Sequence, residues 1–213
     1  MKKLISIALI SLPLLFSSNI LAEGFNDNYI QVGYSTSNYK FTDKITTVSG
    51  SAEFGNNYSI LGSYSYETGD WRDPGEYETS TYTGIIIGIG KTFELDTNTD
   101  ITSSLSFLDY DIKQTRKGDG ETITTNSSSK TDTYIASIGV RNLSDSGIQT
   151  NLKLNIWRAG KLKPKSNEIE LEVIKHFNET LSIGGRVLRH DAKPSSSYNS
   201  DWTEYGVFLR RSF

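Results

Sequence analysis

Few residues in this chain belong to the types that perform catalysis or bind metals. The sequence contains two histidines, His176 and His190, and no cysteine. A thiol nucleophile, a disulfide framework and a thiolate metal site are therefore excluded, and so is a site with three histidine ligands. We predict no metal site and no cofactor.

Two short groups carry the residue types that hydrolysis uses. Asp109-Tyr110-Asp111 places two carboxylates two positions apart, and His190-Asp191 places a base beside an acid. A hydrolase needs such groups oriented together with a nucleophile. The alternative is that these aspartates are solvated rim charges, which is usual for Asp beside a loop.

The overall charge excludes one large class of partner. Lys and Arg total 22 and Asp and Glu total 25, a formal net charge of −3. Nucleic-acid binding needs a basic footprint, so we predict no nucleic-acid partner.

The first residues have the three-part pattern of a secretory signal peptide. Met1-Lys2-Lys3 is positively charged, an apolar run continues to Phe16, and Ala22 offers a small residue for cleavage. The apolar run is shorter than the ~20 residues of a spanning helix. We therefore predict a signal peptide at 1–22 and a single exported domain at 23–213.

Apolar and polar residues alternate with a period of two in ten segments of the exported part. This period is typical of β-strands with one apolar face. The segments are 30–35, 48–54, 58–66, 83–90, 101–107, 134–141, 148–156, 168–173, 181–187 and 203–213.

The connections between these segments alternate in length. Short ones lie at 55–57, 94–100, 142–146 and 178–180, and long ones at 37–44, 68–78, 113–130, 158–166 and 191–201. Short turns at one end and long loops at the other, with an even strand number, are typical of an up-and-down antiparallel transmembrane β-barrel. We predict a single all-β barrel of ten strands, with eight as the alternative.

The two faces of the strands decide between a soluble and a membrane barrel. Aromatic residues gather in two groups, as in the belts of a membrane protein, and the opposite face is rich in Gly and Ser, which suit a narrow lumen. Both observations favour a membrane barrel over a soluble one. The first group, near the short turns, comprises Phe54, Tyr58, Phe93, Phe177 and Phe213; the second, near the long loops, comprises Tyr64, Tyr66, Phe107, Tyr134, Trp157 and Trp202.

The chain resembles small Gram-negative outer-membrane β-barrels of the porin-like and OmpA-like superfamily. The signal peptide, the ten alternating segments and the terminal strand carry the resemblance. The resemblance implies the cell outer membrane as location, with lipid, lipopolysaccharide, the barrel-assembly machinery and periplasmic chaperones as partners. It also implies an assembly signal formed by Tyr205, Val207, Leu209 and Phe213, although Arg211 stands where that signal usually has an apolar residue.

Charged residues on the inward face predict an ion network in the lumen. They are Glu53, Arg141, Lys153, Glu170, Glu172, Arg186, Glu204 and Arg210. A turn centred on Glu179 places Glu172 opposite Arg186, and a loop centred near Leu162 and Lys163 places Lys153 opposite Glu172. Buried charges need such partners. We predict a non-enzymatic barrel plugged by salt bridges, with a narrow solute channel as the first alternative.

A rim enzyme is the second alternative. The chain is similar to the ten-stranded omptin proteases in having paired aspartates and a histidine at the loop end. It departs from them at Leu188, where that family has Asp, and in its shorter length.

One long loop carries four closely spaced cations, Arg158, Lys161, Lys163 and Lys165. They follow the predicted outer aromatic group, at the height of the outer-leaflet glycolipid phosphates, and such cations bind phosphate by charge-assisted hydrogen bonds. We predict that this loop contacts glycolipid, with a merely solvated basic loop as the alternative.

Overall fold

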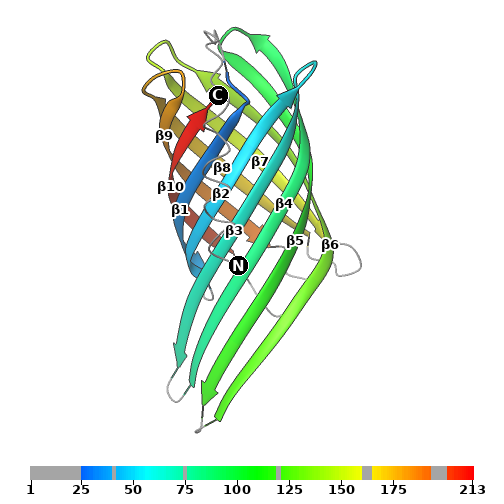
Figure 1. Cartoon of the computed structure of the whole chain (residues 1–213), viewed down its shortest axis with the longest axis vertical. Coiled ribbons are helices and arrows are strands. Elements are labelled where there is room, and N and C mark those ends of the chain that lie inside the picture. The colour runs from blue at the N-terminus through cyan, green and yellow to red at the C-terminus, as the bar shows by residue number, and fades with distance from the viewer. Residues whose placement is uncertain (1–24, 40–41, 74–75, 119–120, 160–164, 193–200) are drawn as a thin grey trace.

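The computed structural model describes residues 25–39, 42–73, 76–118, 121–159, 165–192 and 201–213. Each strand pairs antiparallel with its sequence neighbours, and β1 pairs with β10 to close a barrel (Figure 1). The strands are β1 (Tyr29–Tyr39), β2 (Thr42–Phe54), β3 (Tyr58–Asp73), β4 (Glu76–Asp96), β5 (Thr99–Gly118), β6 (Glu121–Leu143), β7 (Ile148–Ala159), β8 (Lys165–His176), β9 (Leu181–Ala192) and β10 (Trp202–Ser212). The predicted ten-stranded up-and-down barrel is confirmed.

Alternation along each strand sorts the side chains between the two faces of the barrel. In β10, Tyr205, Val207 and Leu209 are more than half exposed on the outside, whereas Glu204 and Arg210 are buried inside. The same pattern around the ring gives an apolar outer surface and a polar interior, as in a barrel that faces lipid. In the described part of the chain, no helix has the length and apolarity needed to cross a membrane.

The barrel has two unlike ends. The turn end holds the short connections after β2, β4, β6 and β8 and the end of β10, and the loop end holds the other connections (Figure 1). At the turn end, Gly55, Asn56 and Asn57 adopt positive φ angles of 40°, 53° and 62°, which glycine and asparagine tolerate better than other residues. These residue types explain why the β2–β3 connection is tight.

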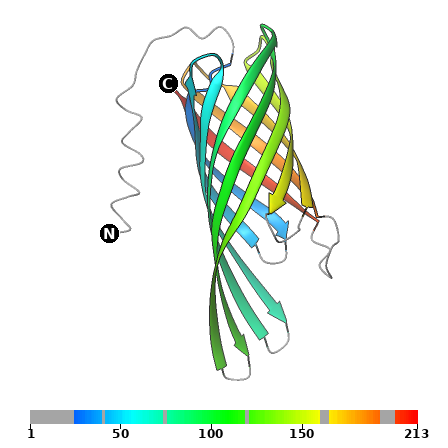
Figure 2. The same cartoon turned by 90° about the vertical axis from the view of Figure 1, so that its right-hand side faces the viewer.

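The ends of β3, β4, β5 and β6 project far beyond the rest of the barrel at the loop end (Figure 2). The β3–β4 ladder continues to Asp73 opposite Glu76, and the β5–β6 ladder continues to Gly118 opposite Glu121. We predicted long loops at 68–78 and 113–130, and both predictions were wrong because these segments are mostly strand. Their sequences are mostly polar and lack the apolar alternation that predicts a strand facing lipid.

Candidate functional site

The inward faces of the strands enclose a cavity of about 810 Å³. Its lining includes Asp27 and Arg141 near the turn end and Glu67 and His190 toward the loop end. The cavity therefore follows the barrel axis, and it is the candidate functional site.

One side of the cavity, on β2–β6, is lined mainly by small residues. We call it the small-residue wall, and larger apolar side chains such as Leu61 and Leu108 interrupt it. At Gly88 a Cβ atom would lie 2.8 Å from the carbonyl oxygen of Leu105, so a side chain does not fit there without a backbone shift. The small members are Thr47, Ser49, Ser51, Ser59, Ser63, Ser65, Gly84, Gly90, Thr102, Ser104, Ser106 and Ser137.

The opposite side, on β7–β10, carries most of the lumen charges, and we call it the charged wall. Lys153 Nζ lies 3.1 Å from Glu170 Oε1, and Arg186 pairs with Glu204. The members are Lys153, Glu168, Glu170, Glu172, Arg186, Glu204 and Arg210.

Glu172 and Arg210 form the most buried pair of this wall. Arg210 Nη2 lies 3.9 Å from Glu172 Oε2, and both side chains are less than a tenth exposed. Asn151 Nδ2 donates to Glu172 over 2.9 Å, and Arg210 donates from Nε and Nη2 to Gln31 Oε1 over 2.9 and 2.7 Å. Neutral amides thus complete the hydrogen bonding of both charges.

The ion pairs of the charged wall run along the wall. Lys153–Glu170 and Arg186–Glu204 join adjacent strands, and Arg210–Glu172 joins β10 to β8, two strands away. The partners of each pair therefore come from the same arc of the barrel, β7–β10.

The strand register confirms one predicted pairing and corrects another. Glu172 is the register partner of Arg186, as predicted from the turn at Glu179. The prediction that Lys153 faces Glu172 was wrong, because Lys153 lies opposite Glu170. The β7–β8 ladder is centred one residue earlier than we expected.

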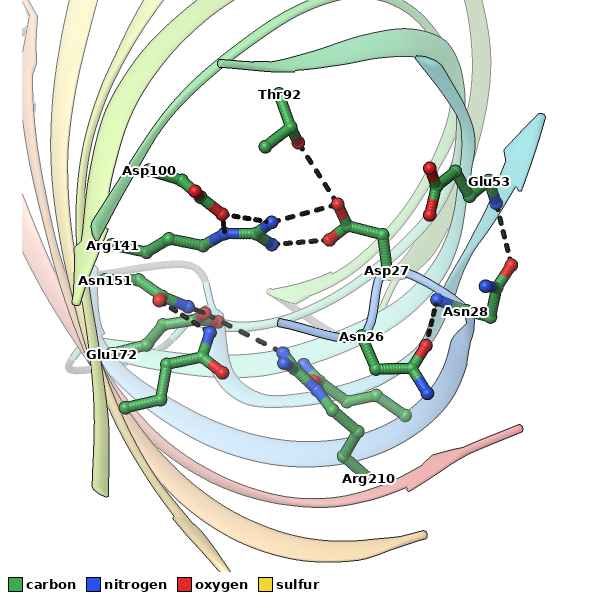
Figure 3. Close-up of polar contacts among 12 residues, drawn as sticks. Asn26, Asp27, Asn28, Glu53, Thr92, Asp100, Arg141, Asn151, Glu172 and Arg210 are labelled. Carbon is green, nitrogen blue, oxygen red and sulfur yellow. Dashed lines mark hydrogen bonds and ion pairs between the residues drawn. The ribbon is translucent and has the colours of Figure 1, made fainter. Parts of the chain in front are cut away.

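A short N-terminal segment crosses the turn end of the lumen. We call Phe25–Asn28 the strap; it precedes β1 and contacts residues of β4 and β6 across the barrel (Figure 3). Asp27 accepts hydrogen bonds from both terminal nitrogens of Arg141, one of them at 3.0 Å, and from Thr92 Oγ1 at 3.1 Å.

Arg141 anchors the strap from the barrel side. Its guanidinium also binds Asp100 at 2.8 Å and lies 4.3 Å from the centre of the Phe25 ring. We predicted Arg141 as a lumen charge but did not predict Asp27 or Asp100 as its partners. Asp27 and Arg141 are 114 residues apart, and no local pattern links them.

A histidine and two tryptophans lie together toward the loop end. His190 Nδ1 is 2.8 Å from Glu168 Oε1, and its ring stacks on Trp202 with centres 5.0 Å apart. Trp157 lies edge-on to His190 at 6.5 Å. The prediction that Trp157 and Trp202 belong to an outer belt was wrong, because both share the inward phase of their strands and line the cavity.

Glu53 differs from the other predicted lumen charges. It is exposed at the turn end, its backbone N–H donates to Asn28 Oδ1, and its side chain forms no ion pair with any described residue. It lies at the end of β2, where the inward face opens to solvent. We therefore do not include Glu53 in the charged wall.

The structure does not bring the predicted hydrolytic residues together. Asp109 and Asp111 are exposed on the outer face of β5, whose neighbours Leu108 and Tyr110 line the cavity. His190 faces the lumen from β9. These carboxylates therefore cannot meet the imidazole in this arrangement.

A second histidine does contact a serine, which sequence analysis missed. His176 Nδ1 is 2.8 Å from Ser182 Oγ, and His176 Nε2 is 3.0 Å from Gln149 Oε1. Ser182 is only 1% exposed and the third group is an amide, so a substrate cannot reach this hydroxyl and no carboxylate supports the imidazole. Among the described residues, no cluster of three or more His, Asp and Glu side chains could hold a metal ion.

The remaining predicted sites lie at the edges of the barrel or beyond the described residues. Tyr205, Val207 and Leu209 face outward from β10, and the Phe213 N–H donates to Asn28 O over 3.0 Å. Lys161 and Lys163 of the basic loop and the predicted signal peptide lie outside the described residues, as does most of that loop. Arg158 is exposed, and Lys165 begins β8.

Comparison with known proteins supports the fold. No protein-family model and no curated protein sequence matches the chain. The NanC porin structure is similar with a TM-score of 0.52 and 8% identity, covering 86% of this chain and 100% of that one. The translocator domain of the autotransporter NalP from Neisseria meningitidis has a TM-score of 0.52 and 10% identity, covering 100% and 95%.

A third similar structure is an outer-membrane channel from Pseudomonas putida F1, with a TM-score of 0.50 and 8% identity, covering 93% of this chain and 100% of the channel. The fold is thus that of a porin-like outer-membrane β-barrel.

Proposed function

We propose that this protein is a narrow outer-membrane channel for ions and small polar solutes. The observation that carries the proposal is the position of the ion pairs, which lie along the charged wall. Because these charged side chains bind one another within the charged wall, the space along the small-residue wall stays open to water and solutes.

The size of the cavity sets the scale of the solute. Its volume of about 810 Å³ falls within the range of about 300–1,000 Å³ that is typical of small-molecule sites. A polar solute of a few heavy atoms fits this space, whereas a folded protein does not. The serine and threonine hydroxyls of the small-residue wall can replace part of the hydration of such a solute.

A plugged structural barrel is the second candidate, and the strap favours it. Asp27 and Arg141 pair across the lumen and close part of its turn end. The fold alone does not choose between the two, because the similar structures include a porin, a channel and an autotransporter translocator domain.

Planar-bilayer recording of the refolded protein tests the proposal. We expect discrete conductance steps, and Ser104→Trp should reduce them because Ser104 lines the small-residue wall. Leu105→Trp is the matched control, since Leu105 is 60% exposed on the outer face. Folded protein that gives no conductance would contradict the channel and favour the plug.

A further inference from the structure

We infer that the lumen conducts cations in preference to anions. This inference rests on the proposed channel and names the class of solute that it admits. Small inorganic and organic cations and neutral polar solutes are expected to pass, and acidic solutes are expected to be excluded.

The charge balance of the lumen is the first argument. Among the described residues, carboxylates that line the cavity or contact its charged lining outnumber the Lys and Arg side chains that lie on its inward face by seven to four. The carboxylates are Asp27, Glu67, Asp100, Glu168, Glu170, Glu172 and Glu204, and the cations are Arg141, Lys153, Arg186 and Arg210. Lys91 also borders the cavity, but its ammonium turns away to Asn56 O and the Tyr58 ring.

The pairing of these charges is the second argument. Each of the four cations has a carboxylate partner, as in Arg141 with Asp27 and Lys153 with Glu170. A cation that is already paired attracts a passing anion weakly, because the field of its carboxylate cancels much of its own. The unmatched charge of the lumen is therefore negative.

Glu67 places a carboxylate on the small-residue wall, toward the loop end. It stands at the loop-end part of β3, where Ser65 Oγ donates to it over 3.4 Å. Burial, together with the negative charges of Glu204 and Glu168 of the charged wall, raises the pKa of Glu67 to about 7. Above that pH, a solute that passes this level has carboxylates on both sides.

Uncompensated charge in a narrow pore has a strong effect on permeation. The low-dielectric barrel wall focuses the field of the carboxylates into the lumen, which concentrates cations and repels anions. Rings of Asp and Glu produce cation selectivity in channels by this mechanism. The His190–Glu168 contact does not remove the imbalance, since even a charged imidazole would leave two carboxylates unmatched.

The reversal potential in a KCl gradient at pH 8, where Glu67 is ionised, tests the inference. We expect the wild-type channel to reverse on the side of the K⁺ equilibrium potential, and Glu67→Gln to reduce the K⁺ to Cl⁻ permeability ratio by roughly twofold. Glu67→Asp keeps the charge and should retain the preference. Glu179→Gln, in the exposed turn after β8, removes a carboxylate outside the lumen and should change nothing.

The outcomes separate the inference from the proposed function. Conductance that reverses at zero or on the Cl⁻ side would overturn the cation preference and leave the channel intact. Absence of conductance from folded protein would overturn the channel itself. A Glu67→Gln channel with unchanged selectivity would overturn the role of Glu67.

Discussion

The two walls of the lumen are built from the same alternating strands but are stabilised in different ways. The charged wall relies on partners, since Glu172 and Arg210 are both buried and depend on each other and on Asn151 and Gln31. The small-residue wall relies on the lack of side chains, as at Gly88, where a Cβ atom would meet Ser106 and the backbone. The difference shows that one wall can hold the paired charges of the lumen while the small residues of the other leave space for solutes.

The largest expected effect comes from breaking the charged wall. Glu172→Ala leaves Arg210 without its carboxylate and Asn151 without an acceptor, and the loss of one partner of a buried pair typically costs about 3–5 kcal/mol. Denaturant unfolding in lipid vesicles measures the change in the free energy of unfolding. Glu172→Gln keeps an acceptor for Asn151 and should lose less. An unchanged midpoint for Glu172→Ala would show that this carboxylate is fully solvated.

A smaller effect is expected from filling the small-residue wall. In Gly88→Ala the Ser106 hydroxyl can rotate away, but the Leu105 carbonyl oxygen can move only with the backbone, so we expect a loss of about 1–3 kcal/mol. Gly62→Ala is the matched control on β3, because a Cβ atom there meets nothing within 4 Å. Equal unfolding free energies for the two variants would contradict the close approach at Gly88.

The smallest effect on stability is expected at the strap. Asp27→Asn removes the charge that Arg141 binds, and because Asp27 is partly exposed we expect to lose only about 1 kcal/mol. Its main effect should be on conductance, which rises as the strap leaves the turn end of the lumen. Asp145→Asn, in the exposed turn after β6, should not alter the conductance. Unchanged conductance in Asp27→Asn would mean that the strap does not obstruct the path.

The sequence predicts the barrel well because lipid imposes a period of two on every strand. Val207 and Leu209 must face outward, which places Glu204 and Arg210 inside. The orientation of the side chains of the terminal strand can therefore be predicted from this rule alone. The register of β8 and β9 also follows from the short turn at Glu179. Constraints of this kind, which join residues close together in the chain, can be predicted from a single sequence.

Features that depend on distant residues or on polar strands are not visible in the same way. The strap contact between Asp27 and Arg141 joins residues far apart in the chain. The sequences of the projecting hairpins of β3–β6 are mostly polar and resemble loops in composition. Trp157 and Trp202 follow the inward phase of their strands, although their residue type suggested the lipid interface.

The central claim is that the space beside the small-residue wall is open to water, and a single thiol tests it most directly. The natural chain has no cysteine, so Ser104→Cys introduces a unique reactive group into the lumen. We predict that a water-soluble thiol reagent modifies this cysteine in the folded, bilayer-inserted protein and lowers its conductance, whereas Leu105→Cys on the outer face keeps its conductance. A Ser104→Cys thiol that reacts only after unfolding would contradict the account, because it would show that the lumen is plugged.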